Sequence, residues 1–181
     1  MKNIIIKFGS ALAIGALISC GTVSELDVKN VNGSKKYAKV LIKDFAYKGS
    51  AEEVTGSASS TIFPNYISEA VKKDGGFDSV ARSGRPGADT LVIDGDVTRY
   101  AAGNAALRAM VGLGAGSAYF DADVNFRDGA TNQIIGSIKV DNNSWVLGGG
   151  LAAGQTPETF MRGAAKKVAK ESSIFSGKTS Q

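Results

Sequence analysis

Four aspartates, at alternating positions in two stretches of the chain, are the side chains best suited to hold a ligand. Carboxylate oxygens are hard ligands that suit Ca²⁺ or Mg²⁺, and paired carboxylates also carry out glycoside hydrolysis. No loop that would wrap an ion accompanies them, so a solvated strand face with basic residues interspersed explains the pattern better. The weak metal candidates are Asp94, Asp96, Asp121 and Asp123.

The remaining composition argues against catalysis. The chain has 181 residues, no histidine and one cysteine, Cys20. Ser-His-Asp and Cys-His nucleophiles and histidine metal sites are therefore excluded. We expect no enzyme activity and no cofactor.

Cys20 follows a leader of the secretory type. Residues 1–19 contain Lys2, Lys7 and an uncharged apolar run, FGSALAIGALI, that is too short to be a permanent membrane span. The residues before Cys20, Leu17-Ile18-Ser19, resemble the lipobox of bacterial lipoproteins. The resemblance implies cleavage between Ser19 and Cys20, then a diacylglyceryl thioether and an acylated amine, with chains such as palmitate. Two or more chains anchor a protein stably.

The residues after the cysteine predict a flexible tether. Residues 20–36 are the lipidated end and a polar stretch, and Gly21–Lys36 as coil would average about 20–25 Å end to end. The residue after Cys20 is not Asp, and this pattern resembles that of lipoproteins sent to the outer membrane. We expect the protein to face the periplasm from there. The formal charge of +4 includes Lys2 and Lys7, which leaves +2 after cleavage and does not favour nucleic acid.

A run of small residues suggests a contact surface. Gly112, Gly114 and Gly116 lack the spacing of a dinucleotide fingerprint or a P-loop. Small residues instead permit close approach of a neighbouring element or subunit. Arg108 is the one charge between Ala101 and Ala118 and needs a partner or water. We take Arg108, the three glycines and Trp145, the sole tryptophan, as possible interface residues, either core or contact.

Three alternating stretches predict an antiparallel meander that positions these residues. Apolar and polar residues alternate over Leu91–Val97, Ala118–Phe126 and Ile134–Val140, with an Asp128-Gly129 turn between the last two. A period of two gives one buried and one solvated face.

The flanking segments supply the cover. Tyr37–Tyr47 reads as a central strand, Lys48–Ser60 as a mobile loop, and Phe63–Lys73 as a helix with Pro64 in its first turn. Asp74-Gly75-Gly76 ends that helix, and Phe77–Arg82 is a second strand, parallel to the first if the unit is a crossover.

A second helix begins at Thr156-Pro157-Glu158 and buries Phe160, Ala164 and Val168. We therefore predict one α/β (α+β) domain over residues 37–172. It is a mostly antiparallel mixed sheet in the order strand, helix, four strands, helix, with two helices packed on it. Residues 173–181 should be a disordered tail.

Several motifs carry a family resemblance: DTLVIDGDVTRY from Asp89, Gly103-Asn104 with Arg108, the Gly112–Gly116 run, Phe126–Gly129 and Ser144–Gly149. They resemble the bacterial lipoproteins grouped as domain of unknown function 4410, over Tyr37 to Ala169. The element order is more distantly similar to domains of the curli-secretion channel lipoprotein and of a lipoprotein activator of a peptidoglycan synthase. That resemblance implies a fold and no chemistry.

The leading hypothesis is a non-catalytic periplasmic module, anchored to the membrane by its lipid. It would bind or assemble with other envelope proteins or itself through sheet edges and the Ala101–Gly116 segment. The alternatives are a subunit of an oligomeric export complex, and a domain that binds a divalent metal or small ligand.

Overall fold

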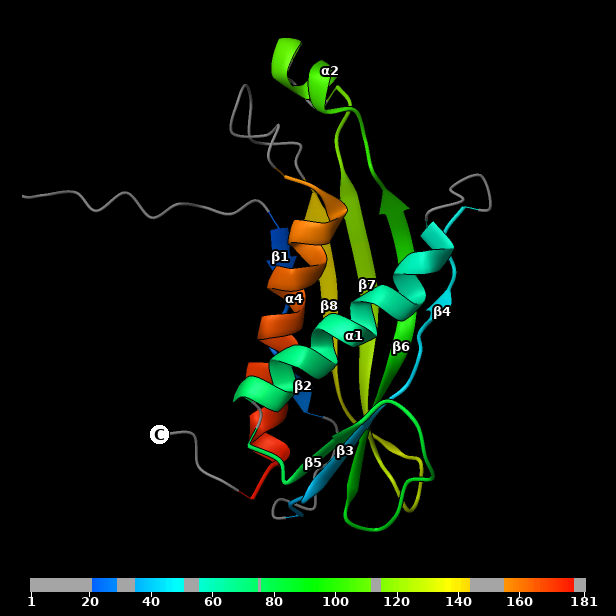
Figure 1. The fold of residues 1–181 in the computed structure, drawn as a ribbon, viewed down its shortest axis with the longest axis vertical. Helices are drawn as coiled ribbons and strands as arrows, with labels where there is room; N and C mark the ends of the chain where they lie inside the picture. The colour runs from blue at the N-terminus through cyan, green and yellow to red at the C-terminus, as the bar shows by residue number, and fades with distance from the viewer. Residues whose placement is uncertain are drawn as a thin grey trace, which may run out of the picture.

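The computed structural model describes residues 21–28, 35–50, 56–74, 76–111, 115–143 and 155–177. Two long helices lie on one face of an eight-stranded mixed sheet (Figure 1). The elements in chain order are β1 (Gly21–Val23), β2 (Asp27–Val28), β3 (Lys39–Ile42), β4 (Ala46–Tyr47), α1 (Gly56–Asp74), β5 (Ser79–Ala81), β6 (Thr90–Ala101), α2 (Ala105–Met110), β7 (Tyr119–Asp128), β8 (Ile134–Asn143), α4 (Pro157–Ser172) and η1 (Ser173–Phe175). The predicted fold class is confirmed.

The sheet combines the predicted meander with a parallel unit. Its strand order is β1-β8-β7-β6-β3-β5, with β2 also paired to β8 and β4 to β6. β6, β7 and β8 are antiparallel neighbours, whereas β3 runs parallel to both β5 and β6. β3, α1 and β5 form the expected crossover, with the short strand β4 between β3 and α1. Val40, Leu41 and Ile42 of β3 are all buried.

Alternation in β7 creates the buried face of the sheet. Phe120, Ala122, Val124 and Phe126 are buried, and the residues between them are partly exposed. α1 covers this face with Phe63, whose ring lies edge-on to Phe120 at a centroid distance of 4.9 Å. Offset or edge-on ring pairs are favoured by the ring quadrupole.

α4 covers the rest of the buried face. Its N-cap is Thr156, whose side chain accepts a bond from the Thr159 amide while the Thr159 side chain accepts one from the Thr156 amide. This capping box satisfies two donors that a helix start leaves unpaired. Ala164 and Val168 are buried, as predicted for this helix, whereas Phe160 is only partly buried and packs against the edge of the core.

The expected start of α1 was wrong. The helix begins at Gly56, seven residues before Phe63, and Pro64 lies in its interior. A proline removes the N–H that would bond the carbonyl four residues earlier. Here that carbonyl belongs to Ser60, and it accepts a bond of 2.9 Å from the Phe45 amide. The proline is therefore tolerated because an element outside the helix satisfies the freed acceptor.

Both ends of the domain are more ordered than the sequence predicted. β1 and β2 pair with β8 where a flexible tether was expected, and Val23 and Leu26 pack against the core. At the other end, the predicted disordered tail does not hold for residues 173–176. Phe175 is buried, with its ring 5.4 Å from that of Phe126. Val23, Leu26 and Phe175 are apolar side chains that pack against the core, and β8 offers edge backbone groups with which β1 and β2 pair.

Candidate functional site

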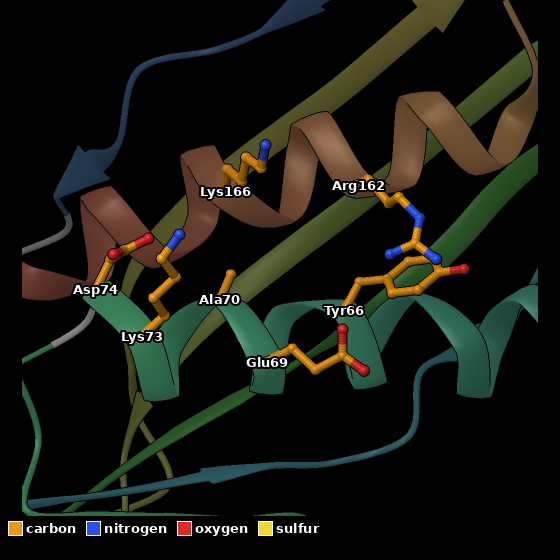
Figure 2. Close-up of a pocket in the computed structure, with 7 residues that line it drawn as sticks. All are labelled: Tyr66, Glu69, Ala70, Lys73, Asp74, Arg162 and Lys166. Atoms are coloured by element: carbon orange, nitrogen blue, oxygen red, sulfur yellow. The ribbon is translucent and has the colours of Figure 1, made fainter.

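A groove between α1 and α4 is a concave surface of the domain with charged side chains along both walls (Figure 2). It has a volume of about 270 Å³. Helix α1 supplies one wall and α4 the other, and Ala70 leaves room between them because its side chain is short. The residues that line it are Tyr66, Glu69, Ala70, Lys73, Asp74, Arg162 and Lys166.

One end of the groove is held by a three-residue cluster. The Arg162 guanidinium lies over the Tyr66 ring, 4.0 Å from its centroid, as Figure 2 shows. Arg162 also forms an ion pair of 3.0 Å with Glu158, and the Tyr66 hydroxyl donates to the same carboxylate at 3.0 Å. A stacked and paired arginine has a fixed orientation, so this cluster fixes α4 against α1.

The protonation states in the cluster follow from these contacts. Burial, and then the bond to Glu158, raises the pKa of Tyr66. The bond from Arg162 lowers the pKa of Glu158, and the same bond raises the pKa of Arg162. Tyr66 therefore stays neutral at ordinary pH and keeps its O–H on the Glu158 carboxylate, whereas the other two stay charged. Such a groove can bind polar groups of either sign, and it offers no activated nucleophile.

The sequence did not predict this groove. Arg162 and Lys166 lie exposed on α4, and nothing in the sequence connects them with α1. A signal was present, because Tyr66, Glu69 and Lys73 are spaced by three and four residues and so share one helix face. What the sequence lacked was the pairing of that face with α4.

The four predicted aspartates lie on β6 and β7, but they do not form one cluster. Asp94 is paired with Arg127, whose Nε lies 2.8 Å from Asp94 Oδ2 and 3.0 Å from Oδ1. Asp96 lies opposite Asp123 in the register of the two strands. Within the described segments, no group of three or more His, Cys, Asp or Glu side chains is placed to hold a metal ion.

Asp121 has a different neighbour. It lies opposite Asp141 of β8 on one side and Arg99 of β6 on the other. Burial, and then the charge of Asp141, raises the pKa of Asp121, and Arg99 offsets part of the effect. Its Oδ1 atom is buried and has no hydrogen-bond partner among the described residues. This carboxylate is therefore the most poorly accommodated of the four.

The predicted interface segment forms the connection between β6 and β7. Asn104 caps α2 by accepting a bond of 3.1 Å from the Leu107 amide, and Arg108 lies within this helix. Gly116 has a φ of +68° and its carbonyl accepts a bond of 2.8 Å from the Asn104 amide. A side chain at Gly116 would lie 2.5 Å from the Asn104 carbonyl. Only a glycine therefore allows the two ends of this connection to approach so closely. Gly112, Gly114 and Trp145 lie outside the described residues.

Ser19 and Cys20 also lie outside the described residues, but Gly21, which follows them, is the first residue of β1. Gly21 lies opposite Asn142 of β8. Within the described ranges, no helix combines the length and the apolar character needed to cross a membrane.

The fold and these surfaces define a small mixed α/β domain with one helical layer. The chain belongs to the family described as "Domain of unknown function (DUF4410)", whose model matches residues 24–148. The family resemblance expected from the sequence motifs is thus confirmed. No curated protein matches the chain.

Solved structures show the same fold in PelC from Paraburkholderia phytofirmans. The chain is 14% identical to a single-residue variant of PelC, solved as a dodecamer, with a TM-score of 0.57, over 87% of this chain and 99% of that one. For a second PelC dodecamer the identity is 13% and the TM-score 0.54, with the same coverage. At these identities the likeness is one of fold.

Proposed function

We propose that this protein is a non-catalytic module of the bacterial envelope, anchored by a lipid on Cys20, that assembles with copies of itself. The observation that carries the proposal is the fold shared with PelC over nearly all of both chains, since those PelC structures are dodecamers. The lipobox-like residues before Cys20 support the anchor, with the outer membrane, facing the periplasm, as its place.

The described side chains favour assembly over the other hypotheses. The groove between α1 and α4 offers a neutral tyrosine and paired charges in place of an activated nucleophile. Asp94, a metal candidate, forms an ion pair with Arg127. Nothing in the described residues favours metal binding over a solvated strand face, and capture of other envelope proteins remains compatible with the same surfaces.

The anchor is tested by fractionation. The full chain is expressed in a bacterium with two membranes, and its membranes are separated on a sucrose gradient. We expect the unaltered protein in the outer membrane and Cys20→Ser in the soluble fraction. Ser19→Ala is the matched control, because it keeps a small residue before the cysteine and should stay in the membrane. An unaltered protein in the soluble fraction would contradict the anchor, and one in the inner membrane would contradict the location.

Assembly is tested by the mass of the purified lipidated chain in detergent, measured by light scattering. We expect a closed oligomer, a dodecamer if the arrangement follows PelC. A monomer at every concentration would reject self-assembly. A closed oligomer would also favour the second candidate, a subunit of an export complex.

A further inference from the structure

Exposed apolar side chains are concentrated at α2. The described part of the chain has six exposed large apolar residues, and three of them lie within five consecutive positions at this helix. Met110 is 84% exposed, Val111 61% and Leu107 45%. We call these three residues the α2 tip. Neighbouring exposed apolar residues mark a contact surface, whereas single ones do not.

The α2 tip lies at the end of the domain where the anchored terminus begins. Gly21 lies opposite Asn142, which lies opposite Phe120, which lies opposite Tyr100. Three strand spacings of about 4.8 Å place Gly21 about 14 Å from Tyr100 across the sheet. α2 begins five residues after Tyr100 and projects beyond the strands, away from η1 at the opposite end (Figure 1).

We infer that the α2 tip is a second membrane contact, inserted at the boundary of headgroups and acyl chains beside lipidated Cys20. This inference rests on the proposed anchor. Cys20 is directly followed by β1, so the chain has no slack between the lipid and the sheet. With that anchor in place, a lipid surface is always within reach of this end of the domain.

The contact sets orientation. A lipoprotein with more than one acyl chain is already stably bound, so three apolar side chains add little to its retention. They instead choose which side of the domain faces the membrane. The test must therefore measure the surroundings of the α2 tip, because membrane binding alone would not change when the tip is altered.

The full lipidated chain is labelled with an environment-sensitive fluorophore at Met110→Cys, and the lipidated thiol of Cys20 does not react. Ile174→Cys is the matched control, because Ile174 is 46% exposed and lies in η1 at the far end. Each protein is inserted into vesicles of phosphatidylethanolamine and phosphatidylglycerol, with or without brominated acyl chains. We expect a blue shift and quenching by brominated lipid at position 110, and neither at position 174.

The outcomes separate the inference from the anchor. If the labelled proteins float with the vesicles but position 110 remains in water, the anchor stands and the contact is wrong. A blue shift without quenching by brominated lipid would place the tip against protein, such as a second copy, and would also overturn it. If neither protein floats, the anchor itself fails, and the contact that depends on it fails too.

Discussion

The Tyr37 hydroxyl donates a hydrogen bond of 2.8 Å to the carboxylate of Asp128, a residue 91 positions further along the chain. Asp128 also accepts bonds of 2.9 Å from the amides of Ala130 and Thr131 and forms an ion pair with Lys35. The turn between β7 and β8 is thus joined to the segment that enters β3. Because both Tyr37 and Asp128 are buried, this bond should contribute to stability.

Tyr37→Phe should lower the free energy of unfolding by about 1.5–3 kcal/mol, the usual value for a hydrogen bond to a charged group. Urea unfolding followed by circular dichroism measures the change. Tyr66→Phe is the matched control, because it removes a similar bond to the exposed carboxylate of Glu158 and should cost clearly less than Tyr37→Phe. If both variants lost the same free energy of unfolding, the buried Tyr37–Asp128 bond would contribute no more than the exposed Tyr66–Glu158 bond, which would contradict the prediction.

The same pair predicts sensitivity to acid. Burial raises the pKa of Asp128, but the bonds from Lys35, the Thr131 amide and Tyr37 outweigh it and hold the pKa well below its usual range. The stability that follows is present above the unfolded pKa of about 3.9 and is lost as the pH falls below it. The free energy of unfolding should therefore decline below about pH 4. Asp128→Asn should be less stable at neutral pH and should show a smaller decline in acid.

Asp121 predicts the opposite pH dependence. Because burial and Asp141 raise its pKa in the folded state, its contribution to stability is present below about pH 3.9 and is lost as the pH rises. Asp121→Asn should therefore raise the free energy of unfolding at pH 7 by about 0.5–1 kcal/mol, the scale of a partly exposed charge interaction. Urea unfolding at neutral and acidic pH measures both limits.

Asp141→Asn relieves the same repulsion from the other side. The two substitutions together should gain less than the sum of the single gains, since each removes one partner of a single interaction. Additive gains would show that the two carboxylates do not interact.

Two glycines should respond oppositely to alanine. A side chain at Gly95 would lie 2.0 Å from the Asp123 carbonyl and 2.8 Å from the Phe45 ring, so Gly95→Ala should destabilise by about 3 kcal/mol or prevent folding. Gly163 lies exposed in α4, and no atom of the described segments lies within 4 Å of an added side chain. Gly163→Ala should stabilise by about 0.5–1 kcal/mol. Thermal unfolding of both variants measures the contrast, and a stable Gly95→Ala would contradict the close approach.

Local patterns were sufficient for the elements whose cause is local. The alternation in β7 and the Thr156-Pro157 start of α4 depend on neighbours within a few residues, and the structure confirms both. The start of α1 could not be found in this way. Pro64 is tolerated inside the helix only because the Phe45 amide, nineteen residues earlier, bonds the carbonyl that the proline leaves free.

The residue types of the candidate sites were likewise predictable from local sequence, whereas their arrangement was not. The types of the four aspartates were evident from the sequence, but their separation into an Asp94–Arg127 pair and an Asp121–Asp141 neighbourhood depends on strand register. Likewise, the groove requires α1 and α4 to meet. A linear pattern identifies a helix face, and only tertiary packing decides which other face it meets.

The pairing of β1 and β2 with β8 leaves little free backbone at either side of the sheet. β8 has ten residues, and these two short strands cover its outer edge, while the opposite edge is β5, with only three residues. Long uncovered edge strands are where chains add to one another without limit, as in fibrils. Copies of this domain therefore have few backbone groups with which to join sheet to sheet, and a finite assembly has to be built from side-chain surfaces whose geometry can close.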